Sequence, residues 1–150
     1  NKTIGNGIYY SMCEEDLCDI ITAPHSVVGS DGICRGFTET THPRAWGTFP
    51  HAICLYVKEK KVLTLEQMIR KMTSLPAERA MLDGKGVIKD GWDADLVLFD
   101  FEKLQDKANY TDSNALTEGI DTVIVGGEIV YHDKKLTDAT PGKLILHHKR

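Results

Sequence analysis

An acidic residue, Asp31, follows a short apolar run at residues 26–29 and precedes Gly32. The run contains β-branched residues and ends in small ones, which predicts a buried strand. In an α/β barrel, a carboxylate just beyond the carboxyl end of a strand lies on the face where catalytic sites are built. There it can coordinate a metal ion, transfer a proton, or do both. The alternative is an Asp-Gly turn without a chemical role, because both residues are common in turns.

Four stretches of the sequence occur in the order found in one enzyme family. They are Val-Val-Gly-Ser-Asp-Gly at 27–32, His-Pro-Arg and Gly-Thr-Phe-Pro within 42–50, Lys-Met-Thr-Ser-Leu-Pro-Ala at 71–77, and Gly-Trp-Asp-Ala-Asp-Leu-Val-Leu-Phe-Asp at 91–100. They resemble the N-acyl-D-amino-acid deacylases (D-aminoacylases) of the amidohydrolase superfamily, and the 42–50 stretch points to the deacylase branch. The resemblance covers nearly the whole chain but only the C-terminal part of the family. We therefore expect a fragment of an enzyme.

The resemblance implies hydrolysis of the amide bond of an N-acyl-D-amino acid, giving a D-amino acid and a carboxylic acid. In such enzymes a zinc ion polarises the amide carbonyl and lowers the pKa of its bound water. Asp31 matches the residue that takes the proton of this water and passes it to the leaving nitrogen, and it is also a candidate zinc ligand. Arg44 matches the residue that binds the α-carboxylate of the substrate, which a planar guanidinium can hold with two hydrogen bonds.

His42, in the same motif as Arg44, is a further candidate substrate-binding residue, with a loop histidine making one hydrogen bond as the alternative. For Arg44 the alternative is an ordinary surface ion pair, for example with Glu39. The other zinc ligands of the family are His and Cys residues of earlier barrel strands, and those stretches do not occur in this sequence. A catalytic zinc needs about three protein ligands. We therefore expect zinc in the full-length parent, and neither tightly bound zinc nor activity in the fragment.

Hydrophobic periodicity divides the chain into two parts. Residues 1–83 are expected to be the last strand and helices of a TIM barrel, with helices over 11–23, 49–60, 64–73 and 76–82 and a long loop at 32–48. Ser11 with Glu14 and Thr64 with Gln67 form capping boxes that predict two of the helix starts. Residues 84–150 are expected to form half of a small antiparallel β-sandwich. Its strands are predicted at 86–88, 94–99, 122–125, 128–131 and 144–146, with Gly126-Gly127 as a hairpin turn.

Composition limits the partners. A net charge of −4 and a pI near 5.8 give no basic surface for nucleic acid, and no apolar run approaches the roughly 18 residues of a membrane span. The four cysteines, Cys13, Cys18, Cys34 and Cys54, contain no Cys-x-x-Cys pair, so a zinc knuckle is not expected. We expect reduced thiols in a cytoplasmic protein, with disulfides as the alternative that an even number of cysteines leaves open. Unpaired strand edges predict self-association or pairing with the missing N-terminal part.

Two other interpretations stay open. A dihydroorotase- or hydantoinase-like cyclic amidohydrolase would keep the superfamily and change the substrate, although the His-Pro-Arg and Gly-Thr-Phe-Pro residues argue against it. A non-catalytic α+β interaction module would instead use the β-layer to pair with a partner. A substrate panel on the full-length protein tests the first interpretation. An upstream reading frame that encodes a barrel with His-x-His would exclude the second.

Overall fold

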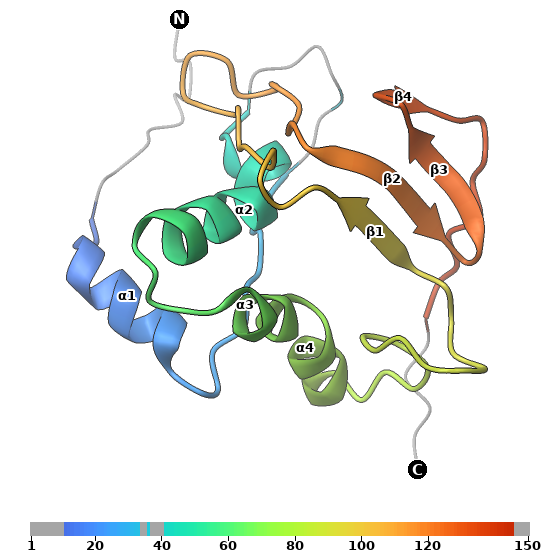
Figure 1. Ribbon diagram of the computed structural model, residues 1–150, viewed down its shortest axis with the longest axis horizontal. Helices are drawn as coiled ribbons and strands as arrows, with labels where there is room; N and C mark the ends of the chain where they lie inside the picture. The colour runs from blue at the N-terminus through green and yellow to red at the C-terminus, as the bar shows by residue number, and fades with distance from the viewer. Residues whose placement is uncertain (1–10, 34–35, 37–40, 146–150) are drawn as a thin grey trace, which may run out of the picture.

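The computed structural model describes residues 11–33, 36 and 41–145. Figure 1 shows helices on one side of the molecule and an antiparallel sheet on the other. The helices are α1 Glu14–Thr22, α2 Arg44–Ala52, η1 Ile53–Glu59, α3 Leu65–Met72 and α4 Ser74–Arg79. The strands are β1 Leu96–Phe99, β2 Ile120–Val125, β3 Glu128–His132 and β4 Lys135–Leu136. They form a meander in the order β1-β2-β3-β4 with antiparallel neighbours, which confirms the predicted antiparallel layer.

Two capping boxes were predicted, and one of them forms. At the start of α3, the Gln67 backbone N–H donates to Thr64 Oγ1 (3.3 Å), and the Thr64 N–H donates to the Gln67 side chain (2.8 Å). The predicted helix start at Ser11 is wrong, because α1 begins at Glu14 and its N-cap, Cys13, makes no side-chain capping bond. Three acidic residues fill the first turn of α1, where they favour the positive end of the helix dipole.

The predicted loop at 32–48 ends earlier than expected, because α2 already begins at Arg44; residues 34–35 and 37–40 of this loop lie outside the described residues. Pro50 lies inside α2 and has no N–H to donate to the helical ladder. The helix nevertheless continues as the wider π-helical turn η1, in which the Lys60 N–H donates to the Leu55 carbonyl five residues earlier (2.8 Å). The fourth helix, α4, carries Pro76 in its first turn and ends at Arg79, short of the predicted end.

The strand predicted at 26–29 is not formed. The Val28 N–H donates to the Lys71 carbonyl (3.1 Å) on a helix, and no strand pairs with this segment within the ranges the structure describes. A buried strand of this kind needs parallel neighbours on both sides, and the described residues form only the antiparallel sheet β1–β4. The strand predicted at 86–88 is also wrong: Ile88 is 89% exposed, and the stretch between α4 and β1 is a series of turns. Residues 144 and 145 are not in a strand, and residue 146 lies outside the described residues.

The Gly126-Gly127 hairpin is confirmed. Both glycines have positive φ, 57° and 86°, as the favoured two-residue hairpin turn requires. The turn is also tied to the segment before β1: the Gly126 N–H donates to Asp95 Oδ1 (2.7 Å), and the Gly127 N–H donates to the Ala94 carbonyl (3.0 Å). Asp95 in turn pairs with Lys85. These contacts fix the hairpin against the turns that follow α4.

The helices and the sheet share one core. Its buried members are Ala52, Ile53, Met68 and Leu104, the first three from helices and the last from the connection after β1. Phe99 and Ile120 of the sheet pack against this cluster. Among the described helices, none is long and apolar enough to cross a membrane.

We expect Thr64→Ala to remove the side-chain cap of α3 and to lower the free energy of unfolding by about 1 kcal/mol, which corresponds to a fall in Tm of about 3 °C. Thermal denaturation followed by circular dichroism measures the change. Thr64→Ser keeps a hydroxyl acceptor and serves as the control, so equal losses in the two variants would contradict the capping role.

Candidate functional site

Asp31 and Arg44 form an ion pair on the surface. Arg44 Nη2 lies 2.9 Å from Asp31 Oδ2, and the side chains are 45% and 84% exposed, respectively. Exposed pairs contribute about 0–1 kcal/mol to stability, so this pair does little to hold the fold together. The pair places a carboxylate, which can accept a proton, beside a guanidinium, which can bind an anion. The two predicted residues are thus brought together.

The backbone around Asp31 explains how so exposed a side chain is placed. Asp31 has a φ of +46°, which is uncommon for a residue other than glycine. Gly32 follows it, and its N–H donates to Ser30 Oγ (3.2 Å). A Cβ on Gly32 would lie 2.9 Å from Ala45 Cα, closer than such atoms can approach. Only glycine at position 32 therefore lets this turn rest against the first turn of α2, which carries Arg44.

His42 lies beside the pair and holds the start of α2. Its Nδ1 accepts the backbone N–H of Arg44 (3.1 Å), one of the first-turn N–H groups without a helical partner. Its ring meets Tyr110 edge-on, with centroids 5.3 Å apart. Burial and the positive charge of Arg44 lower the pKa of His42 below its usual value, with Asp31 acting in the opposite direction. The structure therefore favours a neutral imidazole that accepts a hydrogen bond. His42 also makes the single hydrogen bond that the alternative interpretation expects.

Sequence reasoning did not single out the contacts that α2 makes further along its length. Asp106 Oδ2 lies 3.0 Å from His51 Nδ1, and its side chain is only 10% exposed. A Cβ on Gly47 would lie 2.3 Å from Asp106 Oδ1, so the glycine makes room for this carboxylate. Asp106 and Tyr110 come from a connection more than 50 residues away in sequence, and no local pattern marks them. These contacts fasten the helix that presents Arg44.

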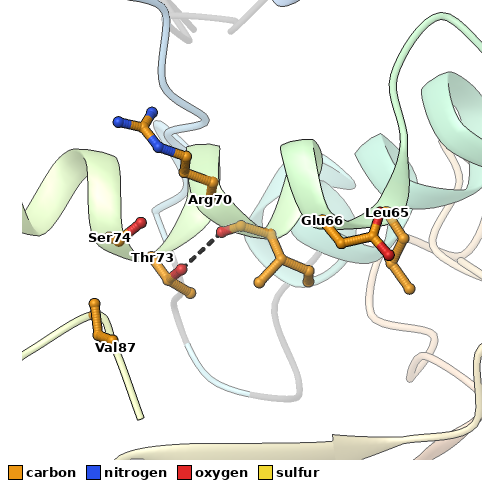
Figure 2. Close-up of a pocket in the computed structure, with 8 residues that line it drawn as sticks. Leu65, Glu66, Arg70, Thr73, Ser74 and Val87 are labelled. Atoms are coloured by element: carbon orange, nitrogen blue, oxygen red, sulfur yellow. Dashed lines mark hydrogen bonds between the residues drawn. The ribbon is translucent and has the colours of Figure 1, made fainter. Parts of the chain in front are cut away.

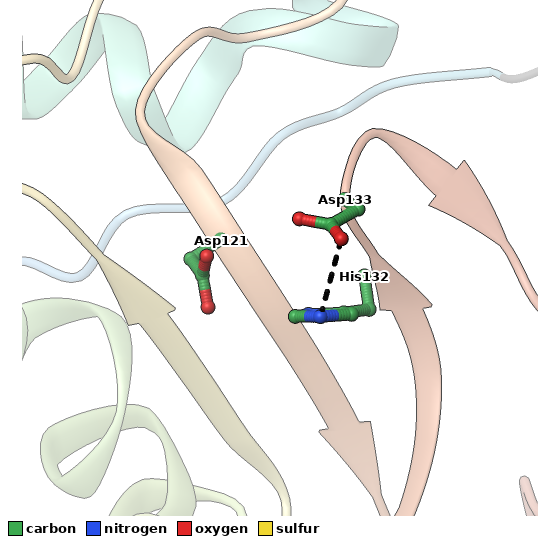
Figure 3. A group of neighbouring side chains, drawn as sticks. All are labelled: Asp121, His132 and Asp133. Atoms are coloured by element: carbon green, nitrogen blue, oxygen red, sulfur yellow. Dashed lines mark ion pairs between the residues drawn. The ribbon is translucent and has the colours of Figure 1, made fainter.

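Asp31 does not belong to a metal-binding cluster among the residues that the structure describes. Over the described ranges, the only group of three His, Cys, Asp or Glu side chains close enough to share an ion consists of Asp121, His132 and Asp133. Figure 3 shows this group on β2 and at the end of β3, where all three residues are exposed. His132 Nδ1 is already bonded to Thr122 Oγ1 (2.9 Å). The described residues around Asp31 therefore do not fit a zinc site by themselves.

Two surface hollows lie away from the pair. One, of about 410 Å³, lies between α3, α4 and the turn that follows them, and Figure 2 shows Val87 facing Thr73 and Ser74 across it. Another, of about 560 Å³, lies beside β2. Neither is lined by Asp31, His42 or Arg44. With side chains 84% and 45% exposed, Asp31 and Arg44 lie on the surface of the part of the chain that the structure describes.

Comparison with known proteins assigns the family. Residues 15–131 match the model of the amidohydrolase family. The chain belongs to that family. An N-acyl-D-aspartate deacylase of Alcaligenes xylosoxydans xylosoxydans is 36% identical to this amidohydrolase over 138 residues, which are 92% of this chain and 27% of that protein. The amidohydrolase chain spans only about a quarter of the length of this relative.

Solved structures agree with the family assignment. A crystal structure of D-aminoacylase matches 87% of the amidohydrolase chain with a TM-score of 0.82 and 34% identity, and 27% of that structure is covered. The N-acyl-D-glutamate deacylase of Bordetella bronchiseptica, solved with zinc and a phosphonate inhibitor, matches 81% with a TM-score of 0.75 and 35% identity, and 25% of it is covered. The predicted resemblance to D-aminoacylases is confirmed.

We expect the imidazole of His42 in this amidohydrolase to titrate below its usual pKa of 6.5. Arg44→Met should raise the pKa of His42, and Asp31→Asn should lower it further, because the two charges act in opposite directions. The unfolded chain then binds more protons than the folded chain between the folded pKa and 6.5, so stability falls as pH decreases through that window. NMR titration of the ring protons measures the shifts, and shifts of the same sign in both variants would contradict this arrangement.

Proposed function

We propose that this chain is the carboxy-terminal part of a zinc-dependent hydrolase that cleaves N-acyl-D-amino acids. Residues 1–83 would complete its TIM barrel, and residues 84–150 would form half of its β-sandwich. The observation that carries the proposal is the ion pair between Asp31 and Arg44, whose atoms lie 2.9 Å apart. Its support is membership of the amidohydrolase family together with relatives that are named deacylases.

Arg44 is the residue proposed to bind the α-carboxylate of the substrate. A guanidinium offers five N–H donors in a planar fork, and Asp31 is the only partner of this fork among the described residues. The donors that no described residue uses can receive a second carboxylate with two parallel hydrogen bonds. The pair with Asp31, 2.9 Å from Arg44 Nη2, supports the view that this guanidinium can bind a carboxylate. The Arg44 backbone is fixed in the first turn of α2, where its N–H donates to His42 Nδ1. His42 is proposed to contact the substrate beside Arg44.

Asp31 is the residue proposed to move the proton. In an N-acyl amino acid, a single carbon atom separates the carboxylate from the amide nitrogen. A base beside the carboxylate-binding Arg44 is therefore within reach of the scissile amide. Asp31 accepts a proton from the attacking water as the new C–O bond forms, and it returns that proton to the nitrogen as the C–N bond breaks. The products are a carboxylic acid and a D-amino acid, and Asp31 ends ionised as it began.

Asp31 is also the candidate zinc ligand of this chain. Because the described residues around Asp31 form no three-ligand cluster, the other ligands of a zinc ion would come from the part of the enzyme that precedes them. When bound, the ion would supply polarisation of the amide carbonyl and activation of water.

We expect Asp31→Asn in the full-length enzyme to lower kcat by about 10²–10⁴-fold. The asparagine side chain keeps the shape of the aspartate but cannot accept the proton. Steady-state hydrolysis of N-acetyl-D-amino acids measures the effect. Glu78→Gln, on an exposed carboxylate of α4 that pairs with Arg70, is the matched control and should leave kcat unchanged. Wild-type kcat in Asp31→Asn would refute the proposed role of the carboxylate.

We expect Arg44→Met to raise KM rather than lower kcat. Losing charge-assisted hydrogen bonds costs about 1.5–3 kcal/mol, which is roughly a 10- to 150-fold change in KM. Arg44→Lys keeps the charge without the fork and should recover only part of the affinity. Amide substrates without the α-carboxylate should react equally with wild type and Arg44→Met. A KM that does not move in either variant would assign the substrate carboxylate to another residue.

We expect the 150-residue chain on its own to retain no zinc after desalting and to hydrolyse no N-acyl-D-amino acid. Metal analysis of the desalted protein tests the first statement, and an amine-release assay tests the second. If the wild-type chain instead retained stoichiometric zinc and the Asp31→Asn variant lost it, this chain would hold the ion by itself. Dihydroorotate and hydantoins belong in the substrate panel of the full-length enzyme, because their ring opening would identify a cyclic amidohydrolase instead.

A further inference from the structure

Lys71, on α3, is a buried charged residue with no part in the proposed mechanism. It is 6% exposed, whereas lysine is rarely buried without a partner. Its Nζ donates to the Ala23 carbonyl (2.5 Å), to Ser26 Oγ (3.0 Å) and to the Ser26 carbonyl (3.2 Å). An ammonium has three N–H donors, so these contacts use all of them. Burial lowers the pKa of Lys71, and the neighbouring Arg70 adds to the effect.

Lys71 also binds the same segment through its backbone. Its carbonyl accepts the N–H of Val28 (3.1 Å). Ser26, which accepts from Nζ, donates its own hydroxyl to the Ala23 carbonyl (3.0 Å) and closes the turn after α1. One residue of α3 therefore holds residues 23–28, and Asp31 lies three positions beyond Val28. Figure 1 shows this segment passing α3 on its way from α1 to α2.

The segment is held again just after Asp31, where Gly32 rests against Ala45. Asp31 thus lies between two fixed points. Its side chain is 84% exposed and pairs with Arg44 alone among the described residues, so packing around the carboxylate contributes little to its position. What places the carboxylate is the path of the backbone, and Lys71 sets that path on one side.

We propose that Lys71 is a positioning residue for Asp31: it fixes residues 23–28 on α3 and thereby sets where the Asp31 carboxylate lies relative to Arg44. The catalytic consequence rests on the function proposed for Asp31 above. The competing account is a lysine that stabilises the fold as a whole and has no particular effect on Asp31.

The first test is a comparison of kcat with KM in the full-length enzyme. Lys71→Met keeps an unbranched side chain, makes it apolar and removes all three N–H donors. We expect kcat per folded molecule to fall by about 10²-fold, the order of loss produced by a displacement of about 1 Å at a reacting group. KM should stay near its wild-type value, because Arg44 is anchored separately on α2. Arg70→Met, at the adjacent exposed position, is the control and should change neither constant.

The second test is a double-mutant cycle with Asp31→Asn. If Lys71 acts through Asp31, Lys71→Met causes no further loss of kcat once Asp31 is replaced, because the two effects share one residue. A further loss of the same size would overturn the proposal and make Lys71 a support of the whole fold. Unchanged kcat in Lys71→Met would overturn it as well. Wild-type kcat in Asp31→Asn alone would instead refute the proposed function.

A third measurement separates position from catalysis. In the 150-residue chain, NMR contacts between the side chains of Asp31 and Arg44 should be lost in Lys71→Met and kept in Arg70→Met. Persistence of those contacts in Lys71→Met would overturn the positioning role whatever the enzyme kinetics show. Should Lys71→Met fail to fold, Ser26→Ala removes one acceptor and keeps the ammonium. It should weaken the same contacts, and an unaltered Asp31–Arg44 pair in that variant would also overturn the proposal.

Discussion

The packing of Leu104 is the interaction that joins the helices to the sheet. Its side chain is 1% exposed and lies in the core with residues of α2, η1 and α3. Its carbonyl accepts hydrogen bonds from Lys58 Nζ (2.8 Å) and Cys54 Sγ (3.4 Å). Gly119, just before β2, approaches its backbone so closely that an added Cβ would lie 2.6 Å away. Burial of one leucine side chain contributes roughly 1.5–3 kcal/mol, and here it couples both layers.

The candidate site follows a different principle from the core. Asp31 and Arg44 are exposed, and the free energy of their pairing is small. The proximity of the two side chains therefore depends on how the backbone is held and not on the free energy of the ion pair. Lys71 holds the segment before Asp31, and Gly32 rests on α2 just after it. His42 accepts the backbone N–H of Arg44 at the start of α2. Each of these contacts lies outside the ion pair, and each restricts the positions that the side chains of Asp31 and Arg44 can occupy.

Two of the three local patterns, one capping box and the hairpin turn, predicted the structure correctly, and the Ser11 capping box did not. The Thr64 capping box and the Gly126-Gly127 turn each depend on residues within a few positions of each other, and both form. The strand predicted at 26–29 was wrong because a strand forms only when it pairs with a neighbour, and no described segment pairs with this one. Asp31 and Arg44 were found from motif resemblance. The buried contacts of Lys71 and Asp106 reach across about 45 and 55 residues, distances at which no sequence pattern operates.

α2 continues directly into the π-helical turn η1, and this turn changes the direction in which the side chains of the continuous helix face. A π-turn is equivalent to one residue inserted into an α-helix, and one residue corresponds to a rotation of about 100° around the axis. Side chains that follow η1 are therefore rotated by about this angle relative to those of α2. Arg44, at the start of this continuous helix, is 45% exposed, whereas Tyr56 and Val57 within η1 pack against the core that contains Leu104.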